Sequence, residues 1–151
     1  MAKNVAVQLV DTLEKAGVKR IYAVTGDSLN EVNEAVRKSG KIKWIHVRHE
    51  ETGAFAAAAE AQLNGELACC AGSSGPGHVH LINGLYDAQR SGAPVLAIAS
   101  TLPTHEFGTE YFQETNTIKL FEDCSYYNQV ATTPEQFPRM LQGAIQAALS
   151  F

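Results

Sequence analysis

Residues 67–77 read Leu-Ala-Cys-Cys-Ala-Gly-Ser-Ser-Gly-Pro-Gly, and this stretch decides the fold class. Its first five residues form a short apolar run, which is typical of a strand covered on both faces. The glycine-rich turn 72–77 ends that strand, and a helical pattern follows from Gly77 to Arg90. A strand that passes through a tight turn into a helix is the repeating unit of an α/β domain.

The same alternation extends along the chain in both directions. Helices are expected over 3–16, from Leu29 to a stop at Gly40, and over 51–64, 116–123 and 134–149; strands are expected over 21–24, 42–48, 67–71, 94–100 and 126–131. The stretch from Thr101 to Phe112 has no clear period. The sequence therefore predicts one domain, residues 1–151, with a three-layer α/β/α architecture and a mostly parallel sheet.

Composition narrows the function classes. Apolar residues make up 45% of the 151 residues, charged residues 19%, and the formal net charge is −4. No basic cluster suits a nucleic-acid backbone, so nucleic acid is not an expected partner. No apolar run approaches the ~20 residues of a membrane span, and no signal-peptide pattern opens the chain. A cytoplasmic protein without a membrane span is expected.

The adjacent cysteines predict buried thiols. Cys69 and Cys70 are adjacent in an apolar strand, so their side chains point to opposite faces, and Cys124 stands alone. No Cys-x-x-Cys or Cys/His spacing of a zinc site occurs. Neither disulfides nor structural zinc are expected.

A carboxylate and a glycine turn mark one edge of the predicted sheet. Ligands of such sheets bind beyond the carboxyl ends of the strands. Glu50 follows the strand that ends near Arg48 and opens an alanine-rich helix, so it is expected at this edge. A carboxylate there could polarise a ring nitrogen of a planar heterocycle. The alternative is a helix N-terminal acid stabilised by the helix dipole, a role that Glu51 could also fill.

The glycine turn suits a flat ligand better than a phosphate. Its spacing is Gly-x-x-Gly-x-Gly, which is neither the dinucleotide fingerprint nor a phosphate-binding loop. Pro76 also lacks the N–H that a phosphate would use. Bare glycine backbone could lie against a ring, although a plain turn before a helix stays open as an alternative.

Other polar residues give weaker indications. His78 and His80 are two apart and would not share a helix face, so no metal site is predicted. His80 alone could reach a ligand. Phe112 and Gln113 either line a small pocket or anchor a loop. The small side chains of Phe55–Ala61 indicate close packing, either against a second subunit or within the core.

Five short motifs follow one another along the chain. They are Thr25-Gly26-Asp27-Ser28-Leu29-Asn30, Arg48-His49-Glu50-Glu51, the turn Gly72–Gly77, Asn83-Gly84-Leu85-Tyr86-Asp87-Ala88 and Tyr111-Phe112-Gln113-Glu114-Thr115. In this order they resemble the motifs of thiamine diphosphate-dependent 2-keto acid enzymes. The resemblance covers essentially the whole chain and is to the N-terminal pyrimidine-binding domain of that family. Within the family it favours the branch of pyruvate oxidase and pyruvate:quinone dehydrogenase.

The resemblance implies a role for each matching residue. Glu50 matches the catalytic glutamate that hydrogen-bonds N1′ of the aminopyrimidine ring of the cofactor and so promotes removal of the thiazolium C2 proton. Gly75, Pro76 and Gly77 match the cofactor-binding turn packed near that pyrimidine. The matching positions around the substrate are Ser28, His80, Phe112 and Gln113.

The resemblance also implies a larger enzyme. Such an enzyme decarboxylates pyruvate, a 2-keto acid, with thiamine diphosphate and FAD, passes electrons to quinone or oxygen, and forms homodimers or homotetramers. Its flavin domain and its domain for Mg²⁺ and the diphosphate are not recognisable here. The chain is therefore expected to bind only the pyrimidine half of thiamine diphosphate and to bind neither FAD nor Mg²⁺. By itself it is expected to be inactive. Acetolactate synthase-like carboligation, simple 2-keto acid decarboxylation and a non-catalytic dimerising module stay open.

Overall fold

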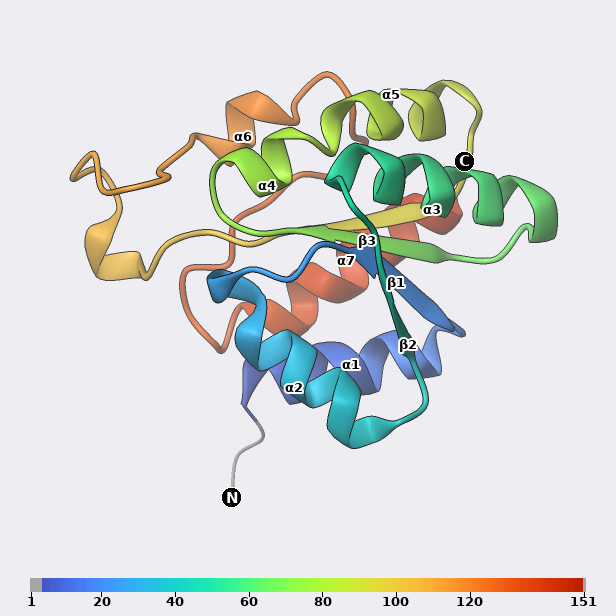
Figure 1. Ribbon diagram of the computed structural model, residues 1–151, viewed down its shortest axis with the longest axis horizontal. Coiled ribbons are helices and arrows are strands. Elements are labelled where there is room, and N and C mark those ends of the chain that lie inside the picture. Colours follow the sequence, from blue (N-terminus) through green and yellow to red (C-terminus); the bar gives the residue numbers. More distant parts are fainter. Residues whose placement is uncertain (1–3, 151) are drawn as a thin grey trace.

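A single parallel sheet forms the centre of the molecule. The structure is a computed structural model that describes residues 4–150. Four strands lie in the order β2-β1-β3-β4, all parallel (Figure 1). They are β1 (Arg20–Ala23), β2 (Lys43–His46), β3 (Ala68–Gly72) and β4 (Val95–Ala99). The predicted α/β class with a parallel sheet is confirmed.

Strand β3 is the most buried element, which explains its continuous apolar sequence. It pairs with β1 on one side and β4 on the other, and all five of its residues are buried. Cys69 and Cys70 are free and buried, as predicted, and Cys124 is free and buried as well. Burial disfavours the thiolate and raises the pKa of Cys70 to about 12, so this thiol stays protonated and unreactive at neutral pH.

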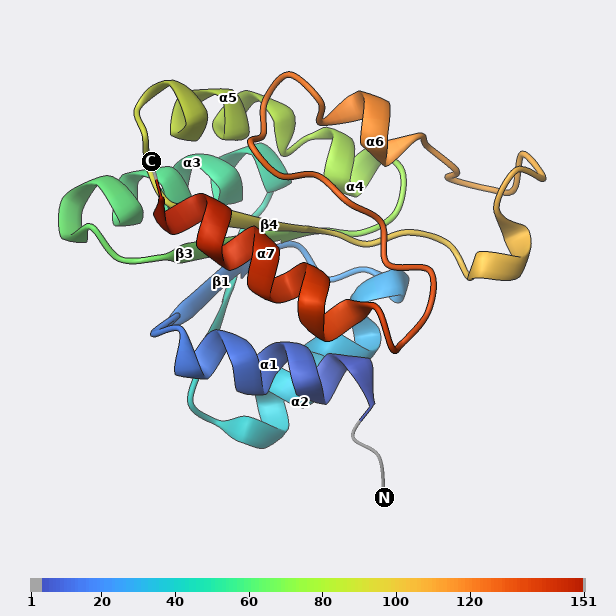
Figure 2. The same ribbon diagram turned by 180° about the vertical axis from the view of Figure 1, so that it is seen from behind.

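Helices cover both faces of the sheet (Figures 1 and 2). One layer holds α3 (Glu50–Asn64), α4 (Pro76–Val79), α5 (Ile82–Arg90) and α6 (Thr117–Leu120); the other holds α1 (Val5–Lys15), α2 (Asn30–Ser39) and α7 (Phe137–Leu149). Two 3₁₀ turns, η1 (Asp27–Leu29) and η2 (Thr104–Glu106), lie in the connections. The buried apolar residues form one cluster on each side of the sheet. No helix within residues 4–150 combines the length and the apolar character that a membrane crossing requires.

The alanine-rich helix α3 uses its small side chains inside the chain. Ala54, Ala57, Ala58 and Ala61 are at most 1% exposed. A Cβ atom placed on Gly84 of α5 would lie only 2.5 Å from the Ala54 Cβ, so the two helices are in close contact. Core packing, one of the two alternatives, therefore accounts for the buried alanines, and association of two copies stays a prediction.

The strand predicted from Tyr126 to Ala131 does not form. This segment is irregular and joins no strand. Ser125 Oγ donates a hydrogen bond to the Phe121 carbonyl at 2.6 Å, and Asn128 Nδ2 donates to the Thr117 carbonyl at 3.1 Å. These bonds attach the segment to the region of α6 instead of to the edge of β4.

Helix boundaries also differ from the prediction, and the helix expected over 116–123 is shortened to α6 (Thr117–Leu120). The helix expected from Pro134 begins at Phe137, because a turn precedes it in which the Thr132 N–H and hydroxyl both bond Gln136 Oε1 at 3.1 Å. The helix expected over 77–90 is divided into α4 and α5. At the division the Leu81 N–H bonds the His78 carbonyl, three residues back instead of four, which tightens the chain locally.

Candidate functional site

Glu50 is the first residue of α3 and is only 8% exposed. Strand β2 ends at His46, and three linking residues bring the chain to the start of α3 at the carboxyl edge of the sheet. His80 Nδ1, at the division between α4 and α5, lies 3.0 Å from Glu50 Oε2. The structure thus unites two of the predicted site residues in one hydrogen-bonded pair.

The glycine turn lies against the other oxygen of this carboxylate. A Cβ on Gly77 would be 3.4 Å from Glu50 Oε1 and 2.6 Å from Ser73 Oγ. A Cβ on Gly72 would lie 2.5 Å from the Gly77 carbonyl oxygen. Glycine is therefore required for the turn to fold back this tightly. Within residues 4–150, Oε1 receives no hydrogen bond, so it remains an acceptor beside bare backbone.

Ser28 joins the turn to the loop that follows β1. Its hydroxyl oxygen accepts a 2.9 Å hydrogen bond from the Ser74 N–H, and its carbonyl accepts a 2.7 Å bond from the Ser100 hydroxyl. These contacts link the ends of three strands. The Ser28 hydroxyl is thus committed to the turn, and neither Ser28 nor Asp27 caps α2 with its side chain.

Gln113 is held against the same turn. The Ser74 hydroxyl donates to Gln113 Oε1 at 3.2 Å. Gly75 has a φ of +69°, a conformation that favours glycine, and a Cβ there would lie 2.7 Å from the Gln113 Cβ. Close contact of the turn with residue 113 thus depends on the glycine at position 75.

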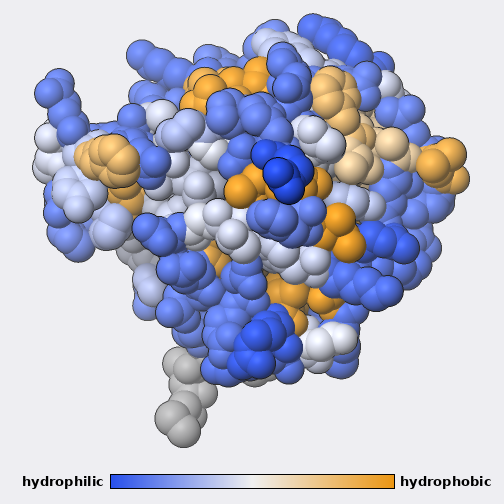
Figure 3. Space-filling view, viewed as in Figure 1, coloured by the Kyte–Doolittle hydropathy of each residue, from blue (hydrophilic) through white to orange (hydrophobic). Residues whose placement is uncertain are grey.

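Phe112 is not brought into this cluster. Its side chain is 77% exposed, on the segment 101–113 that projects from the body of the molecule (Figure 1). Phe107 and Tyr111 of the same segment are also exposed, and Figure 3 shows hydrophobic surface on this projection. A substrate contact of Phe112 stays a prediction.

His78 is a buried structural histidine. Its ring is 1% exposed, and its Nδ1 lies 2.8 Å from the Ser100 carbonyl oxygen. A carbonyl can only accept, so Nδ1 carries the hydrogen, and Nε2 accepts from the Thr115 hydroxyl at 2.5 Å. Both ring nitrogens are satisfied in the neutral tautomer, and burial lowers the pKa of His78. As expected, His78 and His80 do not act as a pair.

This histidine should make stability depend on pH. The unfolded chain takes up a proton near pH 6.5, whereas folded His78 takes it up only at lower pH because its pKa is lowered. Its stabilising contribution is therefore complete above pH 6.5 and is lost as the pH falls from there, by up to about 1.4 kcal/mol per pH unit. Urea unfolding at several pH values should show this slope, and His78→Asn, which keeps an N–H for Ser100, should flatten it. An equal slope in both proteins would contradict the assignment.

A family comparison decides the class of protein. The family model described as "Thiamine pyrophosphate enzyme, N-terminal TPP binding domain" matches residues 3–120. The chain belongs to the thiamine pyrophosphate enzymes. The fold expected from the resemblance is confirmed, and the buried carboxylate at the carboxyl edge of the sheet lies within the matched region.

Curated proteins with different names resemble the chain, and the named enzymes among them have more than one activity. An uncharacterized 42.6 kDa protein of Pseudomonas amyloderamosa is 58% identical over 97% of the chain and 37% of its own length. Pyruvate oxidase of Lactiplantibacillus plantarum is 40% identical over 93% of the chain and 23% of its length. Acetolactate synthase 3 of Brassica napus is 34% identical over 94% of the chain and 22% of its own length. The chain thus spans well under half of these relatives.

The residues at the sheet edge fit the pyrimidine end of thiamine pyrophosphate. Glu50 Oε1 is an acceptor with no partner among residues 4–150, and the Gly77 backbone lies beside it with no side chain between. An aminopyrimidine ring needs both features. Its ring nitrogen shares a hydrogen with a carboxylate oxygen, and its flat face lies against backbone that carries no side chain.

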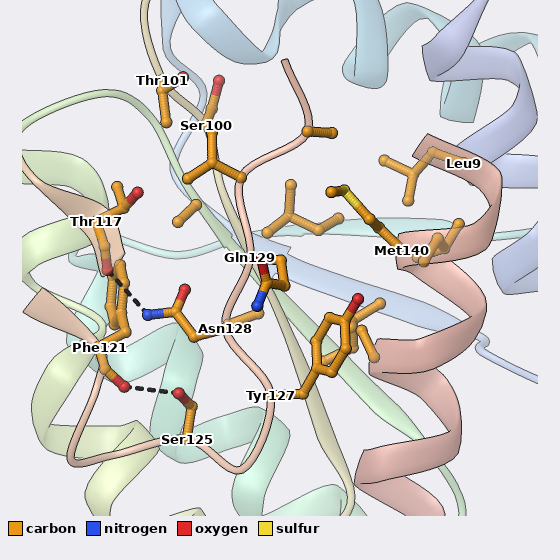
Figure 4. Close-up of a pocket in the computed structure, with 18 of the residues that line it drawn as sticks. Leu9, Ser100, Thr101, Thr117, Phe121, Ser125, Tyr127, Asn128, Gln129 and Met140 are labelled. Carbon is orange, nitrogen blue, oxygen red and sulfur yellow. Dashed lines mark hydrogen bonds between the residues drawn. The ribbon is translucent and has the colours of Figure 1, made fainter. Parts of the chain in front are cut away.

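A large cavity of this thiamine pyrophosphate enzyme domain lies elsewhere. It encloses about 690 Å³ between β4, α1, α7 and the irregular segment 125–133, and it includes neither Glu50 nor His80 (Figure 4). Met140 of α7 and Tyr127 of the segment line it. Its lining is mainly apolar, and it separates the segment from β4, where the sequence predicted a fifth strand.

Sequence reasoning missed His49. Its ring stacks on that of His80 with centroids 4.3 Å apart and planes inclined by 27°. His49, Glu50 and His80 each offer one possible metal-ligand atom, and these three atoms lie within 4.8 Å of one another. The position of His49 next to Glu50 was visible in the sequence, but its proximity to His80 depends on the fold.

Proposed function

We propose that the chain is the pyrimidine-binding domain of a thiamine diphosphate- and FAD-dependent enzyme that oxidatively decarboxylates pyruvate and passes the electrons to quinone or oxygen. The observation that carries the proposal is the buried Glu50, with one carboxylate oxygen bonded by His80 and the other beside Gly77. When bound, the cofactor supplies a carbon nucleophile and an electron sink for 2-keto acid chemistry.

The residues of the chain have separate tasks in this proposal. Glu50 shares a proton with the pyrimidine ring nitrogen through Oε1, while His80 fixes the carboxylate through Oε2. The turn Gly75-Pro76-Gly77 lies against the flat ring, and Ser28 and Gln113 hold the turn in place. His80 and Phe112 face the 2-keto acid once the rest of the enzyme is present.

The remaining parts of the active site belong to the proposed parent enzyme. Other domains bind FAD, Mg²⁺ and the diphosphate, and copies associate into a homodimer or homotetramer. By itself the chain binds the cofactor weakly and turns over nothing, because it holds only the pyrimidine half.

The branch of the family can be tested by product analysis. We expect the full-length protein from the natural gene to contain flavin, to bleach it when pyruvate is added without oxygen, and to release CO₂ without acetolactate. Identity of 40% to a pyruvate oxidase, against 34% to an acetolactate synthase, supports this branch. Acetolactate as the main product, with flavin left oxidised, would overturn it.

Acetolactate synthesis is the second candidate function. It is favoured by the 34% identity that extends over 94% of the chain. Both reactions begin with decarboxylation of a 2-keto acid, so Glu50 has the same task in each, and the product experiment separates them.

A further inference from the structure

Three side chains at the start of α3 and the end of α4 form a set of transition-metal donors. They are His49, Glu50 and His80. One donor atom from each lies within 4.8 Å of the other two. Two imidazoles and one carboxylate are the ligand set of open zinc sites, in which water occupies the fourth position. Imidazole nitrogen favours zinc over magnesium, which takes oxygen ligands.

We propose that these three residues bind Zn²⁺. Ligand nitrogens and oxygens lie about 2.0–2.1 Å from zinc, so they need to be about 3.4 Å apart in a tetrahedron. Glu50 Oε2 and His80 Nδ1 are already 3.0 Å apart, and donors as far apart as 4.8 Å must approach by roughly an ångström. The rings of His49 and His80 are about half exposed and have room to turn, whereas Glu50 is held by its burial.

Neighbouring groups would support the bound metal. His49 Nδ1 accepts the Glu51 N–H at 3.3 Å in the metal-free chain. Zinc on Nε2 would replace this bond, because Nδ1 would then carry the hydrogen and could donate it to Glu51 Oε2, 3.8 Å away. Glu51 is itself fixed by a 2.7 Å hydrogen bond from Asn83 Nδ2. Two carboxylates also offset the partial positive charge at the N-terminus of α3, which alone would disfavour a cation.

Zinc and the cofactor would compete for the same carboxylate. This consequence rests on the proposed function, because it requires that Glu50 contacts the pyrimidine ring. The metal would then inhibit by blocking the site, and binding of metal to the chain would not need the cofactor at all.

Zinc titration of the metal-free 151-residue chain tests the site. With a chromophoric chelator as competitor, we expect one Zn²⁺ per chain at micromolar concentration, with no displacement by excess Mg²⁺. His49→Gln and His80→Gln should each weaken binding at least about tenfold. The matched controls are His46→Gln and His105→Gln, outside the cluster, which should bind as the original chain does.

The outcomes separate this proposal from the proposed function. Equal zinc affinity in the original chain and in a His49→Gln/His80→Gln double variant, with circular dichroism unchanged, would overturn the metal site. If zinc binds as expected but leaves thiamine diphosphate binding unchanged, the metal site stands and the contact of Glu50 with the cofactor is wrong.

Discussion

Replacing Glu50 with Gln in the full-length enzyme is expected to slow exchange of the C2 proton of thiamine diphosphate by about 10²- to 10⁴-fold. Gln has nearly the same shape but cannot take or give a proton at the position of Oε1, beside Gly77. Overall folding should be retained, because the amide oxygen can still accept the hydrogen bond from His80. The rate is measured by acid-quenched deuterium exchange followed by proton NMR.

The matched control for this experiment is Glu66→Gln. Glu66 also carries a carboxylate, but it is exposed and forms a surface ion pair with Lys19 at 2.8 Å. Exposed pairs contribute about 0–1 kcal/mol, so neither exchange nor stability should change much. If Glu50→Gln exchanges at the original rate, Glu50 is only a helix N-terminal acid and the proposed function loses its catalytic residue.

The sheet was predictable because apolar runs without polar alternation indicate strands that are buried on both faces. The run Ala68–Gly72 is buried on both faces and between two neighbouring strands, so it has no polar alternation. Helices between such runs require crossovers, and crossovers make the strands parallel. A local pattern was sufficient for this inference.

The segment Tyr126–Ala131 shows where local pattern is not sufficient. Its side chains favour a strand, but a strand also needs a partner edge. Hydrogen bonds from Ser125 and Asn128 to carbonyls of the α6 region direct the segment away from β4. Such side chain to backbone bonds compete with sheet pairing, and their partners are not visible in the sequence of the segment itself.

One part of the candidate site was predictable from the sequence, and another part was not. Glu50 and the glycine turn meet because the carboxyl ends of neighbouring parallel strands lie at one edge, which topology alone dictates. The stacking of His49 on His80 depends on how α4 ends, and that detail has no sequence signal. The small side chains of Phe55–Ala61 left both a second subunit and the core open as partners, and only the structure reveals that α5 packs against α3.

That contact between α3 and α5 leads to a large expected effect on stability. Gly84→Ala should lower the free energy of unfolding by about 3 kcal/mol, at the upper end for an overpacked core. The new methyl carbon would lie 2.5 Å from the Ala54 Cβ and 2.6 Å from the Phe55 nitrogen. The second of these atoms is backbone, so the helices must separate. Urea unfolding followed by circular dichroism measures the loss.

Gly143→Ala is the matched control, since it places the same methyl group inside another helix, α7. There the nearest atoms belong to the ring of Tyr127, at 3.1–3.2 Å, and this side chain, which is 36% exposed, can give way. Alanine is also about 1 kcal/mol better than glycine in a helix, so the net change should be within about 1 kcal/mol of zero. Equal effects of the two substitutions would mean that α3 and α5 are not in tight contact. Because Ala54 lies one helical turn after Glu50, a displaced α3 would also move the carboxylate, and Gly84→Ala should weaken cofactor binding in the full-length enzyme as well.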